Sequence, residues 1–415
     1  MRSLRIGLLL GLRQIQRAGK FTTLLIIFVM MLTFLNLIAV SGVLIGLIAG
    51  AEQAVRQNGL GDLVISPKDA EDHILDTEAV IRYLEAYPEI ATYSVRYAGN
   101  AVLEANYKER RNLQNERDET AVTVTGIDPY REDTMSDLSQ WIVEGEYLDP
   151  NEEGYILIGA YYVSQYAELY GDIFETIEEV HPGDTVRMTL GDVSKEFTVK
   201  GIIQSKVDDV NLNTYINEKE FRRLFNRIDR NADLIVMKLH HPEQNAQVKE
   251  SMVQSGLSSY AKIQTFEEGL PKFLTDIKNT FDLLGTFIGS IGIIVASITI
   301  FIIIFINALS RRRHIGILKG IGIERRAIEI AYVLQAAFYA LAGSLLGALL
   351  TYLVLVPHFA ANPINFPFSD GILVAPPEST FIKFMILFVI TLIAGFLPAW
   401  MIARQNTLNS ILGRK

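Results

Sequence analysis

Four long stretches without charged side chains interrupt this 415-residue chain and determine its organisation. Two of them have sharp limits: 28 uncharged residues occupy 283–310, and 40 occupy 330–369. A run of more than about 18 apolar residues is long enough to cross a bilayer as a helix. The pattern therefore predicts four transmembrane helices, at 21–50, 281–310, 329–356 and 381–403. The first of these is longer than a bilayer requires, so we expect it to project beyond the membrane as a stalk.

The segment between the first two spans, 51–280, has the periodicity of a folded α+β domain. Its two ends, 61–99 and 232–266, each read as strand, helix and strand. The part between them, 100–230, is richer in antiparallel strands, which we predict at 121–128, 154–160, 184–190 and 196–203. Two β-α-β units can share one sheet with both helices on the same side. We therefore predict an α-helical membrane protein with four transmembrane helices and a large α+β extracytoplasmic domain, whose 100–230 part is an insertion in a membrane-proximal sheet.

The distribution of charge predicts the orientation. Segments 1–20, 311–329 and 404–415 carry five, six and three basic residues against none, two and none acidic, whereas 51–280 carries 23 basic and 42 acidic. Because short cytoplasmic loops are rich in Lys and Arg, we predict a multi-pass protein of the cytoplasmic (inner) membrane with both termini inside. The loop 311–328 and the tail 404–415 are then cytoplasmic, and 51–280 and the loop 357–380 lie outside.

The N-terminal segment 1–20 places leucines among arginines. This pattern is compatible with an amphipathic helix on the inner leaflet, and equally with ordinary basic sequence that flanks a first span. The formal net charge of the chain is −9, which argues against nucleic acid as a partner.

Recognisable catalytic and ligand-binding motifs are missing from the sequence. It has no cysteine, no phosphate-binding G-x-x-x-x-G-K-[ST] loop and no H-E-x-x-H helix. Only two of its six histidines, His240 and His241, are adjacent, and neighbours on a strand point to opposite faces. We therefore predict a non-catalytic subunit with no cofactor and no metal on this chain.

Glycines spaced four apart occur in three of the predicted spans. Such small-xxx-small spacing lets another helix approach backbone to backbone. We expect these glycines to pack helices, within one chain rather than between subunits: Gly42, Gly46, Gly50, Gly343 and Gly347, with Gly285 and Gly289 in the second span.

Three sequence motifs lie in or beside the second, third and fourth predicted spans. RRRHIGILKGIG (311–322) comes after the second span, AGSLLGALL (342–350) lies in the third, and FLPAWMIARQNTLNSIL (396–412) closes the chain. In this layout and these motifs the chain resembles the four-span permease subunits of ABC transporters, in the superfamily of lipoprotein-releasing, macrolide-export and cell-division permeases. VTGIDPYREDTMSDL (124–138) is similar to a G-x-D-P segment of the lipoprotein-releasing branch, which we take as the closest.

The resemblance implies a coupling site in the basic loop. In that family, ATP and Mg²⁺ are bound by a separate ABC ATPase dimer. A short apolar helix of the permease docks onto this dimer and transmits the movement of the dimer to the external domain. The carried-over coupling residues are Arg313, His314, Ile315, Gly316, Ile317, Leu318, Lys319, Gly320, Ile321 and Gly322. His314 stands where the family usually has glutamate, and this departure leaves its role open.

The resemblance also implies further partners: a second permease, identical or homologous, membrane lipids, and a lipoprotein or periplasmic acceptor. The implied function is release or extrusion of a lipoprotein or other amphiphile. The alternatives are export of the macrolide or peptide type, and division-type signalling across the membrane to a cell-wall hydrolase.

Overall fold

The computed structural model describes residues 2–17, 19–108, 117–167, 175–270, 272–310, 312–366, 369–371 and 373–404. They form two compact units: a membrane unit of Met1–Ala49, Thr275–Phe366 and Asp370–Lys415, and a large domain of Gly50–Leu274 with Pro367–Ser369. Two predictions concern positions outside the described residues: Arg311 in the basic loop, and most of the tail 404–415.

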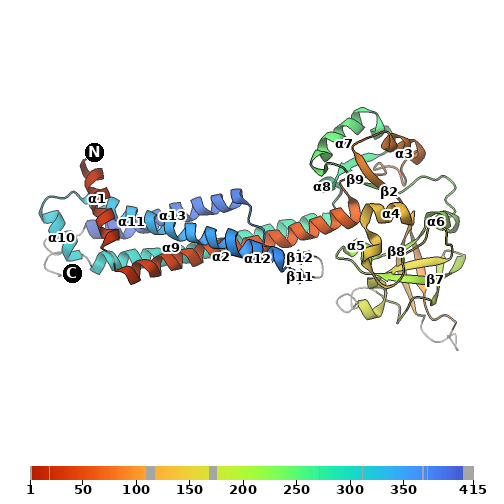
Figure 1. Cartoon of the computed structure of the whole chain (residues 1–415), viewed down its shortest axis with the longest axis horizontal. Coiled ribbons are helices and arrows are strands. Elements are labelled where there is room, and N and C mark those ends of the chain that lie inside the picture. Colours follow the sequence, from red (N-terminus) through yellow and green to blue (C-terminus); the bar gives the residue numbers. More distant parts are fainter. Residues whose placement is uncertain are drawn as a thin grey trace. The chain divides into compact units, whose positions relative to one another are not determined.

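The membrane unit has four helices that are long and apolar enough to cross a membrane, within Lys20–Leu60, Thr275–Ile306, Arg325–Ala361 and Pro377–Met401. They confirm the four predicted spans and, with the large domain, the predicted fold class. The helices are α2 (Lys20–Val55, continued by the π-helical turn η1, Arg56–Leu60), α9 (Lys272–Ser310), α11 (Arg325–Leu350) and α13 (Pro377–Ala403). Two shorter helices, α1 (Arg2–Gln16) and α10 (Arg312–Gly320), belong to the same unit (Figure 1).

The third span ends later than predicted. After α11 the chain continues as η7 (Thr351–Leu355) and α12 (Val356–Ala361), where a structureless loop was expected from 357. Pro357 lies in the first turn of α12, directly after the π-helical turn η7. The remainder of the loop holds a two-stranded sheet of β11 (Ile364–Phe366) and β12 (Ser369–Gly371).

Helix α11 is packed closely against α2. A Cβ atom added at Gly343 would lie 2.3 Å from Cβ of Met30, and one at Gly347 would lie 3.0 Å from Cδ1 of Phe34. Met30 and Phe34 are one turn apart on the buried side of α2, so the backbones approach as the small-residue spacing predicts. By contrast, many apolar side chains of α9 are exposed, for example Phe287 at 61%.

The large domain is built on one continuous ten-stranded sheet. Its strands are β1 (Leu63–Ser66), β2 (Ile90–Glu104), β3 (Glu119–Ile127), β4 (Ile142–Gly145), β5 (Tyr155–Gly159), β6 (Thr185–Leu190), β7 (Val193–Ile203), β8 (Asn213–Asn217), β9 (Leu234–Leu239) and β10 (Lys262–Thr265). The helices of the domain with more than one turn are α3 (Thr77–Glu85), α4 (Pro129–Ser136), α5 (Asp208–Asn211), α6 (Glu218–Leu224), α7 (Asn245–Gln254) and α8 (Phe266–Gly269).

The two predicted β-α-β units do share a sheet, in the order β10-β1-β9-β2. The insertion is not a separate sheet, because β2 is fifteen residues long and its second half pairs with β3 and β6. From there six strands close into a ring, β2-β3-β8-β5-β7-β6. A closed ring removes exposed strand edges and surrounds one apolar core, which includes Leu103, Val124 and Phe197.

The insertion differs from its prediction in two ways. Strands β4 and β8 were not predicted, and the pairs β3–β8 and β5–β7 are parallel where an antiparallel sheet was expected. Alternation of apolar residues indicates that a segment is a strand, but it does not encode which distant strand will be its neighbour or in which direction.

One partly exposed cluster at β4, which pairs with the ring strand β7, predicts a pH dependence of stability. The Glu144 carboxylate accepts hydrogen bonds from the Tyr166 hydroxyl and from His181 Nδ1, the latter at 3.2 Å. These bonds lower the pKa of Glu144, and the same carboxylate raises the pKa of His181. The His181 contribution is therefore complete below its usual pKa of about 6.5 and is lost as pH rises through the raised value, whereas that of Glu144 is lost on acidification.

We expect His181→Gln to destabilise the domain more at pH 5.5 than at pH 8.5. Urea unfolding of both proteins, followed by Trp141 fluorescence, measures the difference at each pH. A difference that is the same at both pH values would show that protonated His181 contributes nothing.

Candidate functional site

The predicted coupling residues lie on α10 and the turn that follows it. The helix ends in a Schellman motif, in which Ile323 N–H donates to Leu318 O (3.0 Å) and Gly322 N–H donates to Lys319 O (3.1 Å). Gly322 has φ +89°, a left-handed conformation that a residue with a Cβ adopts only with strain. The G-I-G sequence at 320–322 therefore serves to end this helix sharply.

A matched pair of glycines tests that role. Apart from the adjacent backbone, no atom of the described residues lies within 4 Å of a Cβ added at Gly320 or at Gly322, and of these two glycines only Gly322 has positive φ. We expect Gly322→Ala to destabilise the turn by roughly 1–2 kcal/mol, and Gly320→Ala, inside the helix, to stabilise α10 by roughly 1 kcal/mol. Hydrogen exchange of the α10 amides measures both changes. Equal effects of the two alanines would contradict the assignment.

Helix α10 has one buried side, which anchors it to the membrane unit. Ile315 is 3% exposed in a cluster that includes Ile304 of α9 and Tyr332 of α11. Gly316 is also buried, and Leu318 and Lys319 are half-buried. Lys319 Nζ donates to Ala403 O at 3.0 Å, the carbonyl of the last residue of α13. The helix is therefore held against three of the four spans.

The opposite side of α10 is open. Arg313, Ile317 and Ile321 follow one another at intervals of four residues and are all exposed, Ile317 to 47% and Ile321 to 72%. We call these three residues the exposed stripe. His314 and Gly320 are exposed too. The structure thus divides the predicted apolar patch, because Ile315 and Leu318 turn inward while Ile317 and Ile321 remain available to a partner.

A polar pocket of about 530 Å³ borders the start of α11. Its charges are mixed, and the guanidinium of Arg404 lies 4.1 Å above the Trp400 ring. The lining residues are Glu324, Arg325, Arg326, Glu329, Phe396, Trp400 and Arg404. The pocket adds charged groups to the same end of the membrane unit as α10, since the turn after α10 leads directly into it.

Helix α1 packs on α11, a contact that the sequence reasoning missed. A Cβ added at Gly7 would lie 2.8 Å from Ile330 Cβ, and one at Gly11 would lie 2.8 Å from Leu334 Cδ2. The segment 2–17 is therefore a helix with a protein partner, and it leaves Leu9 exposed to 63% on its other side. The signal was present as Gly7-x-x-x-Gly11, the same spacing that was noted in the spans.

The other predicted packing glycines lie on α2 and α9. A Cβ at Gly42 would meet Leu373 Cδ1 and Val374 O, both at 2.9 Å, so α2 packs there against the segment before α13. Gly46 is buried and Gly50 is half-buried. A Cβ at Gly285 or Gly289 would only touch α2 leucines, at 3.5 Å.

The motif 124–138 builds the attachment of α4 inside the large domain. Asp128 caps the helix by accepting from Tyr130 N and Arg131 N. Glu132, 1% exposed, forms an ion pair with Arg96 of β2 at 2.6 Å. Burial opposes ionisation of Glu132, but the Arg96 guanidinium and two serine hydroxyls outweigh it and hold the pKa of the carboxyl below its usual range.

In the same domain, hydrogen bonds join several segments at η1 and the residues that follow it. Arg56 Nε donates to Asp62 Oδ1 at 2.7 Å, and Asp62 Oδ2 accepts from Leu239 N at 2.8 Å. The backbone of Asp62 accepts from Phe266 N at 3.0 Å. One aspartate thus joins the N-terminal segment of the domain to β9 and to α8 near its C-terminal end. In the described part of the chain no three His, Cys, Asp or Glu side chains are grouped as metal ligands would be.

Comparisons with known proteins agree with the layout of spans and loop. Residues 286–407 match a family described as "FtsX-like permease C-terminal". The chain is 24% identical over 255 residues to the macrolide export ATP-binding/permease protein MacB of Campylobacter jejuni, over 57% of this chain and 38% of that protein. It is 23% identical to the uncharacterized ABC transporter permease MJ1507 of Methanocaldococcus jannaschii, over 66% of this chain and 65% of that protein.

Among solved structures, the periplasmic region of MacB from Actinobacillus actinomycetemcomitans matches 51% of this chain and 92% of that chain, with 14% identity and a TM-score of 0.34. The extracellular domain of the transporter YknZ from Gram-positive bacteria matches 49% and 97%, with 14% identity and a TM-score of 0.33. The match to the Campylobacter exporter covers less than half the length of that protein, whose name includes an ATP-binding part as well as a permease.

Proposed function

We propose that this chain, an ABC-transporter permease of the superfamily that contains MacB and FtsX, couples ATP hydrolysis on a separate ATPase dimer to movement of its large domain. That movement would release or extrude a lipoprotein or another amphiphile. The observation that carries the proposal is the two-sided α10: Ile315 is locked into the core of the membrane unit, while the exposed stripe is free to dock.

The contacts of α10 support its role as a receiver of force. An exposed isoleucine is stabilised when a partner removes it from water, and a few such anchors carry most of the affinity of an interface. Because Ile315 packs with α9 and α11 and Lys319 is bonded to the end of α13, pushing on the exposed stripe would displace several spans together. Close-packed protein interiors have low compressibility and transmit a displacement rather than absorb it.

The proposed location is the cytoplasmic (inner) membrane, with both termini and α10 inside and the large domain outside. Support comes from the basic residues of 1–20, 311–329 and 404–415 and the acidic balance of 51–280. The exposed apolar face of α9 supports a second permease, identical or homologous, as a further partner beside lipids. We assign ATP and Mg²⁺ to the ATPase and no cofactor to this chain.

The substrate class stays open between two kinds of amphiphile. Lipoprotein release was favoured by the motif 124–138, but its Asp128 and Glu132 have a structural role in attaching α4. The motif is therefore weaker support for that branch than its sequence suggested. Export of the macrolide or peptide type is favoured by the similarity to the Campylobacter exporter.

Division-type signalling to a cell-wall hydrolase is the alternative of a different class, since it needs the exposed stripe and the ATPase but no substrate site. Purification of the intact complex from membranes, with identification of the co-purifying ATPase and cargo, tests the proposal. Crosslinking of an amphiphilic cargo to the membrane unit favours transport. Recovery of a hydrolase without such a cargo would favour signalling, and absence of any ATPase would contradict both.

A further inference from the structure

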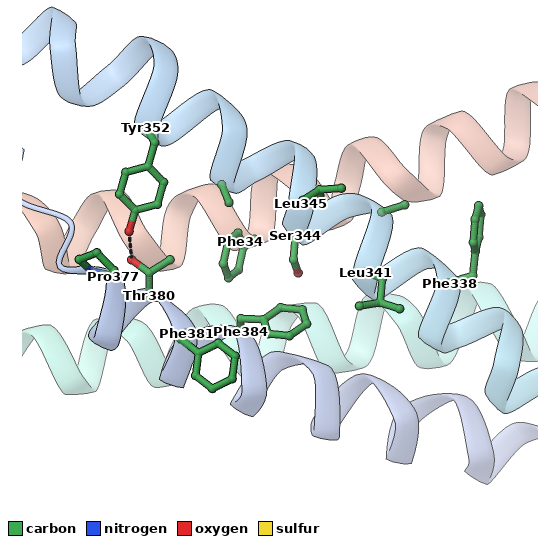
Figure 2. A pocket seen from close by; sticks show the side chains of 12 residues that line it. Phe34, Phe338, Leu341, Ser344, Leu345, Tyr352, Pro377, Thr380, Phe381 and Phe384 are labelled. Carbon is green, nitrogen blue, oxygen red and sulfur yellow. Dashed lines mark hydrogen bonds between the residues drawn. The ribbon is translucent and has the colours of Figure 1, made fainter.

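An apolar groove of about 720 Å³ opens between α2, α11 and α13 in the membrane unit. Phenylalanines and leucines form most of its walls, among them Phe34, Leu341, Leu345 and Phe384 (Figure 2). The volume lies within the range of about 300–1,000 Å³ that is typical of sites for small ligands. The function proposed above assigns no occupant to this groove.

The groove is polar at one end only. There the Tyr352 hydroxyl lies 2.9 Å from Thr380 Oγ1 and donates to Ala375 O at 3.0 Å. Tyrosines gather where a membrane meets water, and α13 begins at Pro377 beside this pair (Figure 2). From Tyr352 to Phe338, at the other end, α11 and η7 rise by roughly 21 Å, more than the roughly 15 Å of hydrocarbon in one leaflet. The groove therefore runs from the membrane interface deep into the apolar layer, as the shape of an amphiphile requires.

Ser344 makes the middle of the groove unusual. It is 2% exposed, its hydroxyl has no hydrogen-bond partner among the described residues, and it lies among the groove side chains (Figure 2). Hydroxyls inside membrane helices normally turn back to the carbonyl four residues earlier. Ser297, Thr351 and Thr391 do so here, at 2.7–2.9 Å. The Ser344 hydroxyl is thus a buried donor without a described partner in the wall of an otherwise apolar groove, where an unpaired polar group is costly.

We propose that this groove binds an amphiphile whose apolar chain carries a hydrogen-bond acceptor, such as a ketone, ester or amide oxygen, that accepts from Ser344 Oγ. Ser344 is eight residues from Tyr352, so the acceptor would lie roughly 12 Å from the polar end of the groove. An ordinary phospholipid acyl chain has only hydrocarbon groups at that depth, none of which has an oxygen to accept a hydrogen bond. The inference names a ligand class beyond the proposed function and concerns this chain alone, so it stands or falls without the ATPase.

The test uses the full chain in vesicles of phosphatidylethanolamine and phosphatidylglycerol. Two photoactivatable phosphatidylcholines are compared, each with a diazirine at the end of one chain, and one of them with a ketone in the middle of that chain. Labelled residues are mapped by mass spectrometry. The reference stripe is a row of exposed residues on α13 that lines no part of the groove: Ile386, Val389 and Ile393.

We expect the keto probe to label the groove roughly 3- to 10-fold more than the plain probe, the gain of one hydrogen bond, with equal labelling of the reference stripe. Ser344→Ala should reduce that ratio to one and leave labelling by the plain probe unchanged. Ala348→Phe, which fills the groove, should lower labelling by both probes to the reference level. Leu353→Phe is the matched control, because Leu353 is 71% exposed outside the groove.

Two results would overturn the proposal. Equal labelling of the groove by both probes in the unmodified chain would mean that it holds an ordinary acyl chain and that Ser344 turns back to its own helix. Labelling no stronger than at the reference stripe would mean that the groove is only a part of the surface that meets bulk lipid. Neither result bears on whether an ATPase docks at α10, so the two proposals fail separately.

Discussion

Replacement of Ile317 by aspartate is expected to abolish ATP-driven transport while the chain still folds and inserts. Ile317 is 47% exposed at the centre of the exposed stripe on α10, so the substitution disturbs internal packing far less than one at buried Ile315 would. An interface with an ATPase would instead have to bury an unpaired carboxylate, which is strongly unfavourable. We expect association with the ATPase to weaken at least about tenfold and substrate-stimulated ATP hydrolysis to be lost.

Co-purification of the ATPase and transport in reconstituted vesicles measure the effect of Ile317→Asp. The matched control is Ile228→Asp, because Ile228 is 83% exposed in the large domain and its replacement should change neither quantity. If Ile317→Asp keeps both ATPase association and transport, the docking of α10 is wrong.

The structure also changes which residue is best for this test. From the sequence, Leu318 was an equal candidate, because it stands among the carried-over coupling residues beside Ile317. Leu318 is half-buried, and its carbonyl accepts the Ile323 N–H in the turn that ends α10. An aspartate there would disturb the fold of the loop itself, so a loss of transport would not identify the docking surface.

The second large effect is expected in the large domain, where Arg96→Met would leave Glu132 buried without its partner. Removal of one member of a buried ion pair typically costs 3–5 kcal/mol. Of the side-chain hydrogen bonds that the Glu132 carboxylate accepts from described residues, those from the Ser94 and Ser136 hydroxyls would remain. We expect a decrease of about that size in the free energy of unfolding. Urea denaturation followed by Trp141 fluorescence measures it.

An exposed ion pair serves as the control for Arg96→Met. Arg223 and Glu153 lie 2.8 Å apart, with side chains 66% and 50% exposed, and surface pairs contribute about 0–1 kcal/mol. Arg223→Met should therefore change stability little. If Arg223→Met lowered the free energy of unfolding more than Arg96→Met, the structural role assigned to the motif 124–138 would be wrong.

This role of Glu132 also bears on function. Asp128 caps α4 and Glu132 holds that helix on β2, and Arg56 and Asp62 tie the entrance of the domain to β9 and α8. Both sets of contacts make the large domain resist deformation near its two ends. A domain of this kind is suited to be moved as a body, which is what the proposed coupling requires of it.

The sequence alone determined the features that depend on local composition. Uncharged length predicted the four spans, and alternation of apolar residues located eight of the ten strands of the large sheet. The arginine-rich I-G-I-L-K-G-I-G segment located α10. In each case a short window contains all the information, because hydrophobic length and strand period are properties of neighbouring residues.

Tertiary structure decided how distant segments meet. It closed the ring of β2 with β6, turned Ile315 inward and Ile317 outward, placed Gly7 and Gly11 of α1 on α11, and left Ser344 facing the groove. A helical repeat shows that one side of α10 is apolar, but not which of its isoleucines meets another helix. Burial and hydrogen bonding are properties of pairs of segments, and these pairs exist only once the chain has folded.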